Sequence, residues 1–226
     1  MSENLGHGFR ELGVFMMELG LKLARRPFDS SRNWIGDKRK QVSGICSENL
    51  WQQWHYDNGI FTVLTAPIFR LVSLSEWNTY LQIFDPRKDN AFMVKASPES
   101  FIIQVVESAD IISRGKLRAT LRSVCRPSKF DNLSRETFVV FLQPAWNKTF
   151  SVTDYPMNMG TSSEIKQVDD PDQNKMTEEI QKIVPPLALR LKDGIIFADF
   201  SRETTKQYYG GSGLQSNIDC FVYLLP

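Results

Sequence analysis

Between residues 59 and 142 the sequence is a succession of short β-prone runs separated by turn residues, and this pattern constrains the fold most strongly. The runs are rich in Val, Ile, Thr and Phe, and pairs such as Asn58-Gly59 and Asp85-Pro86 separate them. Closely spaced strands with no helices between them favour a closed antiparallel sandwich or jelly roll. The predicted strands cover residues 59–65, 68–74, 79–84, 91–95, 101–106, 109–113, 117–125 and 136–142.

Helical patterns flank this β-rich region on both sides. Residues 5–25 carry apolar side chains at helical spacing with charged residues on the opposite face, which predicts an amphipathic helix packed against the outside of the β core. The polar connector that follows contains the basic cluster 38–40, which we interpret as a solvated loop. Towards the C-terminus the sequence predicts an acidic helix over 176–184 and a short helix over 197–208.

Composition excludes several classes of protein. A length of 226 residues allows one good-sized core, and a net charge of +1 argues against a nucleic-acid binder or a polybasic membrane module. The three cysteines include no CxxC motif, so a reducing intracellular setting fits better than a disulfide framework. Charges interrupt the apolar stretches and the N-terminus is not basic, so we expect a cytoplasmic protein with no membrane segment. The oligomeric state is left open.

One of the two histidines lies in Trp54-His55-Tyr56-Asp57, at the head of an apolar, strand-like run. A His and an Asp two residues apart on a strand point to the same face. An imidazole nitrogen and a carboxylate oxygen side by side are two corners of the facial triad of non-haem Fe(II) oxygenases. The motif alone is too short to identify a metal site. The other histidine, His7, has no motif around it and is interpreted as a surface or packing residue.

Four segments occur in an order that resembles the catalytic core of the 2-oxoglutarate/Fe(II) oxygenases related to isopenicillin N synthase, especially plant-type members. They are WHYDNGIFTVLT (54–65), TYLQIFDP (79–86), ESFIIQVVESADIISRGKLRAT (99–120) and SRETFVVFL (134–142). The resemblance implies a mainly β double-stranded β-helix, or jelly roll, with iron at its open mouth. It also implies Fe(II) and 2-oxoglutarate as cofactor and cosubstrate.

Carried over residue by residue, the resemblance makes His55 and Asp57 the first two iron ligands. Arg135 and Thr137 match the Arg-x-Ser pair that holds the distal carboxylate of 2-oxoglutarate. The chemistry suits that role, because a guanidinium binds a carboxylate at two points and a nearby hydroxyl can add a third hydrogen bond. The alternative is that Arg135 is a surface charge and Thr137 an ordinary strand residue.

The sequence departs from the family at the third iron ligand, where Arg122 stands in place of histidine. Arginine has no free lone pair and stays protonated, so it cannot bind a metal. We expect the Arg122 guanidinium to turn toward Asp57. The region before His55 is also shorter than in the family, so the chain resembles a relative truncated at its N-terminus.

Two functions follow from these observations. The first is a 2-oxoglutarate- and Fe(II)-dependent oxygenase-like protein that oxidises a small organic substrate. The second is a non-catalytic jelly-roll remnant that binds a small carboxylate or a protein partner. The chain then divides into an N-terminal helix and polar connector (1–50), the oxygenase-like core (51–146), and a C-terminal loop with helices (147–226). Glu107 and Asp110 are expected in a solvated loop.

Overall fold

The computed structural model describes residues 2–25, 39–41, 49–70, 78–127, 133–153, 155 and 175–215. The fold is mainly β, and all strand pairs are antiparallel, with helices at both ends of the chain. The strands are β1 (Arg39–Gln41), β2 (Leu50–His55), β3 (Phe61–Thr65), β4 (Ile68–Arg70), β5 (Asn78–Asp85), β6 (Asn90–Lys95), β7 (Phe101–Val105), β8 (Arg122–Cys125), β9 (Ser134–Glu136) and β10 (Val139–Leu142).

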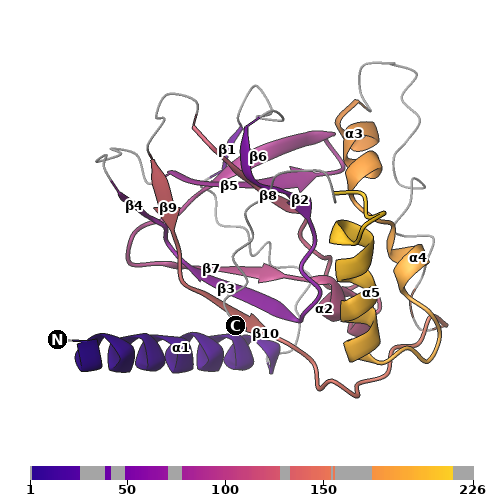
Figure 1. Cartoon of the computed structure of the whole chain (residues 1–226), viewed down its shortest axis with the longest axis horizontal. Coiled ribbons are helices and arrows are strands. Elements are labelled where there is room, and N and C mark those ends of the chain that lie inside the picture. Colours follow the sequence, from indigo (N-terminus) through magenta and orange to yellow (C-terminus); the bar gives the residue numbers. More distant parts are fainter. Residues whose placement is uncertain are drawn as a thin grey trace.

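The strands form two facing sheets, and the chain alternates between them. The larger sheet has the order β1-β6-β5-β8-β2, the smaller has the order β10-β3-β7, and β4 pairs with β9 at one end. Figure 1 shows the larger sheet above the smaller one. Successive segments cross from one sheet to the other, from β2 to β3, β5–β6 to β7, and β8 to β10. This alternation is the topology of a jelly roll, so the predicted fold class is confirmed.

The N-terminal helix α1 (Ser2–Ala24) packs on the outer face of the smaller sheet (Figure 1). Its fully buried Met16 joins a cluster with Phe61, Val63 and Leu142. These three strand residues share the face that points away from the larger sheet. The predicted amphipathic helix and its packing on the outside of the core are therefore confirmed.

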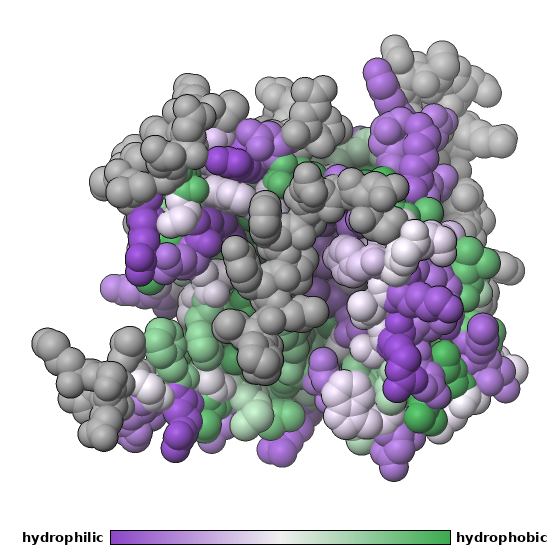
Figure 2. Space-filling view, viewed as in Figure 1, coloured by the Kyte–Doolittle hydropathy of each residue, from purple (hydrophilic) through white to green (hydrophobic). Residues whose placement is uncertain are grey.

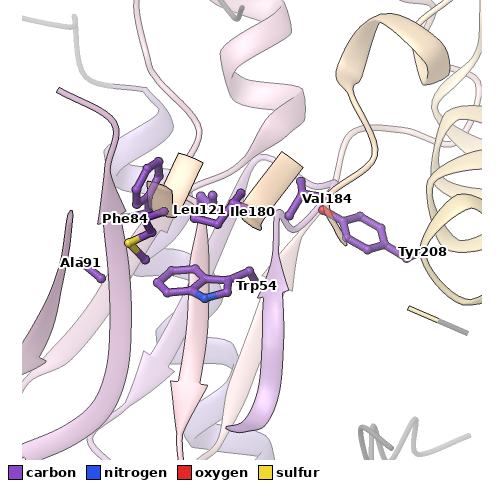
Figure 3. Close-up of a cluster of buried hydrophobic side chains, with 8 residues drawn as sticks. Trp54, Phe84, Ala91, Leu121, Ile180, Val184 and Tyr208 are labelled. Carbon is purple, nitrogen blue, oxygen red and sulfur yellow. The ribbon is translucent and has the colours of Figure 1, made fainter. Parts of the chain in front are cut away.

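Of the C-terminal helices, α3 (Lys175–Ile183) and the end of α5 (Phe197–Tyr209) pack on the larger sheet, and α4 (Leu187–Arg190) packs against α5. Helix α2 (Glu107–Ile112) follows β7. In Figure 3, Trp54, Phe84 and Leu121 meet Ile180 and Val184 from the α3 region and Tyr208 from α5. Figure 2 shows that the outer surface over α3 and α5 is mostly hydrophilic, as expected for helices that bury one side only.

Several predicted boundaries were wrong. The run 109–113, predicted as a strand, lies in helix α2, because periodicity cannot separate a short apolar strand from a buried turn of helix. Residues 117–121 are not in a strand, and β8 begins at Arg122. The run 136–142 is split between β9 and β10. Part of the predicted solvated loop is strand β1, and Lys38 and residues 71–74 lie outside the described residues.

Within the described residues, none of the helices has both the length and the apolar character needed to span a membrane.

Two glycines on the buried side of α1 provide a test of this packing. A Cβ at Gly13 would lie 3.7 Å from the Phe138 ring, whereas a Cβ at Gly20 would lie 2.7 Å from Leu142 Cδ2. Gly13→Ala should raise the free energy of unfolding by about 1 kcal/mol, the difference in helix propensity. Gly20→Ala should gain less or lose stability, because overpacking costs roughly 1–3 kcal/mol. Urea denaturation of both variants measures this, and equal gains would show that α1 does not pack on Leu142.

Candidate functional site

The pairing of β2 with β8 places His55 directly opposite Arg122. Residues directly opposite one another in antiparallel strands have their side chains on the same face. His55 and Arg122 are both about 5% exposed, so the two side chains meet in the interior. Strand register therefore brings the first candidate ligand and the residue at the third ligand position together.

Asp57 is the third member of this group, and it lies in the loop that follows strand β2. β2 ends at His55, so the expectation of two ligands on one strand face was wrong in detail. Arg122 Nη2 lies 2.8 Å from Asp57 Oδ2 and donates to Oδ1 at 3.0 Å. The Thr62 hydroxyl donates to Asp57 Oδ2 at 2.6 Å. The Arg122 side chain has turned to Asp57, as the sequence predicted.

The His55 ring is oriented by the chain itself. Its Nδ1 lies 2.6 Å from the Gln53 carbonyl oxygen, so Nδ1 carries a proton that it donates to that oxygen. Nε2 is buried without a hydrogen-bond partner among the described residues and lies 3.6 Å from Asp57 Oδ1. A metal-bound histidine commonly donates its other N–H to a backbone carbonyl in this way. His55 alone thus has the geometry of a metal ligand.

The group as a whole does not fit a facial iron triad. Such a site needs three ligands with free lone pairs, and Arg122 supplies a cation at the third position. Both Asp57 oxygens already accept hydrogen bonds from Arg122 or Thr62. No cluster of three His, Cys, Asp or Glu side chains suited to a metal occurs in the part of the chain that the structure describes. The arrangement here is an ion pair with a histidine beside it.

The charge on Asp57 depends on Arg122. Burial alone raises the pKa of a carboxyl group. The Arg122 guanidinium opposes that effect, and the neighbouring His55 and Thr62 side chains add to it. The net result holds the pKa of Asp57 well below its ordinary value. Asp57 is therefore a carboxylate at any pH near neutrality.

Arg135 is the second guanidinium of the candidate site, and no acidic side chain among the described residues pairs with it. Its Nε donates to the Thr79 carbonyl at 2.8 Å. Burial, and then the positive charge of Arg122, lower the pKa of Arg135 to about 10.

A strand irregularity lies at the point where Arg135 is held. Tyr80 has φ of +56°, a left-handed conformation that is rare for a residue with a side chain, and the β5–β6 register shifts between Asn78 and Gln82. The Tyr80 ring contacts Phe69 and Trp51 edge-on, at centroid distances of 5.5 and 6.4 Å. Such strain persists only where surrounding contacts fix it. The bulge is thus held beside the carbonyl that accepts from Arg135.

Thr137 follows β9, two residues after Arg135. Its hydroxyl donates to the Thr65 carbonyl at 2.9 Å, so its one proton is engaged within the chain. Its role toward a ligand stays a prediction, as do the roles of His55, Asp57 and Arg135. His7 lies exposed on α1, with Nε2 3.1 Å from Glu11, and takes no part in this site.

The loop that carries Asp57 is fixed by α2 and by the C-terminal helices. The Glu107 backbone N–H donates to the Asp57 carbonyl, and the Glu107 carboxylate binds Arg190 at 2.5 and 2.7 Å. Glu107 and Arg190 are 3% and 0% exposed. Asp110 is buried too, which raises its pKa. The expectation of a solvated loop was therefore wrong, because the partner Arg190 lies 83 residues away.

Two interior polar residues were missed by the sequence analysis. Thr62 is fully buried and Gln104 is 3% exposed, and they lie directly opposite each other on β3 and β7. Each interrupts an apolar run, Phe61-Thr62-Val63 and Ile103-Gln104-Val105. A polar residue at an inward-facing position of a period-two strand was the signal that could have identified them.

No protein-family model matches the chain, and no curated protein matches it. Solved structures with a similar fold include Neurospora crassa T7H in complex with alpha-KG and 5-formyluracil, with 13% identity and a TM-score of 0.41. The rice dioxygenase for auxin oxidation is 19% identical with a TM-score of 0.38, and JOX2 in complex with 2OG, Fe and JA is 21% identical with a TM-score of 0.36.

These matches cover 70%, 71% and 48% of this chain, and 40%, 48% and 30% of the respective structures. The chain therefore spans less than half the length of the structures it matches. Two of these structures contain 2-oxoglutarate, one of them together with Fe, and the third is a dioxygenase. At such identities and TM-scores the likeness supports no conclusion about the activity of this chain.

The Asp57–Arg122 pair should make stability fall at acid pH. The pKa of Asp57 is depressed in the folded protein, so its stabilising effect is fully present above its ordinary pKa of 3.8 and is lost as the pH falls below that value. Between about pH 5 and pH 2.5 the wild type should therefore lose more free energy of unfolding than Asp57→Asn, whose amide does not titrate. Urea denaturation across this range measures both, and parallel curves would contradict the pairing.

Proposed function

We propose that this protein is an oxygenase-like jelly roll that binds a small carboxylate at Arg135, with the Arg122–Asp57 ion pair in the place of a catalytic metal. One observation carries the proposal: among the described residues, one of the two guanidinium groups of the candidate site is paired with a carboxylate and the other is not. Arg122 binds Asp57, and the partner of Arg135 within the described residues is the neutral Thr79 carbonyl. 2-Oxoglutarate is the ligand that the resemblance implies, and the isopenicillin N synthase-like subgroup stays a prediction from the motifs.

Electrostatics support an anion at Arg135. A partly buried cation without a counter-charge is costly, and a second cation nearby adds to the cost. Burial and the charge of Arg122 both lower the pKa of Arg135. A bound carboxylate would offset them through charge-assisted hydrogen bonds to the guanidinium nitrogens that do not contact Thr79. The Thr79 carbonyl fixes Nε, so the guanidinium is already oriented when the ligand arrives.

The same charges disfavour iron. A divalent cation at His55 would have to displace Arg122 from Asp57 or sit beside its positive charge. Breaking a buried ion pair by removing one partner costs roughly 3–5 kcal/mol. The proposed binding of a carboxylate therefore requires no metal.

Arg135→Gln should abolish carboxylate binding. The loss of one member of a desolvated charge pair costs roughly 2–5 kcal/mol, which lowers affinity about 30-fold or more. Isothermal titration with 2-oxoglutarate, without metal, measures the change. Arg70→Gln is the matched control, because Arg70 lies on the adjacent strand β4 but is exposed and pairs with Glu136. Equal affinity of wild type and Arg135→Gln would show that the carboxylate does not bind at Arg135.

A second candidate is the iron-dependent oxygenase activity that the resemblance implies. The His55 geometry favours it, since Nδ1 is anchored to Gln53 and Nε2 is left without a partner. The opposing observation is Arg122. The two candidates differ in whether a metal binds at His55 and Asp57.

Arg122→His separates them. The change removes the cation, frees the Asp57 oxygens and supplies an imidazole directly opposite His55. We expect wild-type protein to hold little iron after anaerobic loading with Fe(II), and Arg122→His to gain it. Arg122→Met is the control that removes the charge without adding a ligand. Equal, stoichiometric iron in wild type and Arg122→His would show that Arg122 does not occupy the third-ligand position.

A further inference from the structure

The side-chain amide of Gln104 is buried without hydrogen-bond partners among the described residues. Neither its Nε2 nor its Oε1 has a hydrogen-bond partner in the described chain, and the residue is 3% exposed. A buried polar group without a partner costs about 1–3 kcal/mol, so a strand retains one only where something else satisfies it. Here both the donor and the acceptor of one amide are unsatisfied. The missing partner must therefore offer an acceptor and a donor side by side, or be solvent.

The register places this amide on the wall of the site already described. Thr62 on the central strand β3 pairs with Gln104 on β7 and with Phe141 on β10. The three side chains therefore form a row across the inner face of the smaller sheet. The Thr62 hydroxyl reaches Asp57, which binds Arg122 from the larger sheet. Gln104 therefore faces the interior next to the Asp57–Arg122 pair.

The row ends at the edge strand of the smaller sheet. Phe141 lies on the edge strand β10 and is 54% exposed, although it shares a face with the fully buried Thr62. The same interior holds further unpartnered atoms, Arg122 Nε and His55 Nε2. Unsatisfied polar atoms thus come from strands of both sheets.

We propose that Gln104 is a recognition residue of this site, and that the ligand is a small, singly charged carboxylate whose other end is an amide. This inference rests on the proposed carboxylate binding at Arg135. An amide offers one donor and one acceptor in a plane, so it satisfies both Gln104 atoms at once. A carboxylate offers acceptors only and would leave Gln104 Oε1 facing a negative charge.

Charge balance gives the same ligand class. Arg122 and Arg135 carry two positive charges and Asp57 carries one negative charge, which leaves one positive charge uncompensated. A monocarboxylate neutralises the group. A dicarboxylate brings one negative charge more than the group can balance, and a buried excess charge is unfavourable whatever its sign.

Isothermal titration with three ligands of similar length tests the inference. Glutaramate has one carboxylate and one amide, 5-oxohexanoate has a methyl ketone in place of the amide, and 2-oxoglutarate has a second carboxylate. Wild-type protein should bind glutaramate about 10-fold more tightly than 5-oxohexanoate, because both ligands can accept from Gln104 Nε2 but only the amide of glutaramate can donate to Gln104 Oε1, which a methyl group would leave unsatisfied. It should also bind glutaramate more tightly than 2-oxoglutarate. In Gln104→Leu the preference for glutaramate over 5-oxohexanoate should disappear.

Gln82→Leu is the control. Gln82 is a buried glutamine too, but its Oε1 accepts from Ser123 and its side chain shares a face with Phe84, away from the site. This variant should keep the preference. Equal affinities of wild-type protein for glutaramate and 5-oxohexanoate would overturn the inference and show that solvent satisfies Gln104, while carboxylate binding would stand. If none of the three ligands binds wild-type protein, both the inference and the proposed function fail.

Discussion

The ion pair between Asp57 and Arg122 joins the two sheets at the centre of the jelly roll. Asp57 lies in the loop that leads from β2 into the smaller sheet, where Thr62 also binds it, and Arg122 projects from β8 in the larger sheet. A guanidinium this deeply buried requires a counter-charge, because an isolated one would cost far more than any packing it allows. The carboxylate of the His-x-Asp motif is thus engaged by the protein itself, and the motif no longer describes a free metal-binding pair.

The second arginine of the candidate site differs from the first in its partner. Arg122 binds Asp57, whereas Arg135, among the described residues, donates to a backbone carbonyl at a bulge held by aromatic contacts around Tyr80. The proposed ligand would satisfy two groups that lack complementary partners among the described residues, the Arg135 guanidinium and the Gln104 amide. In the proposed function, such an interior binds an anion without catalysing a reaction, because side chains alone orient the anion and balance its charge.

The C-terminal helices support the site from outside the jelly roll. Arg190 binds the Glu107 carboxylate with two nitrogens and also contacts Thr204 of α5, while the Glu107 backbone holds the Asp57 loop. Tyr208 of α5 accepts from the Tyr56 N–H in the same loop. A buried ion pair of this kind adds little net stability compared with apolar residues, but removing either partner leaves an uncompensated buried charge. Residues near 190 and 208 thereby fix the conformation around residue 57.

The sequence by itself determined the class of fold and the flanking helices, and it predicted that the Arg122 guanidinium turns to Asp57. These rest on local patterns: period two in the strands, helical spacing in residues 5–25, and the chemistry of arginine at position 122. It failed at 109–113, where a short apolar run fits strand and helix equally, and at Glu107, whose burial depends on Arg190. Only the tertiary structure showed that Arg135 has no acidic partner among the described residues and that Gln104 lies opposite Thr62. Strand register and charge pairing join residues far apart in the chain, and no local pattern of side chains encodes them.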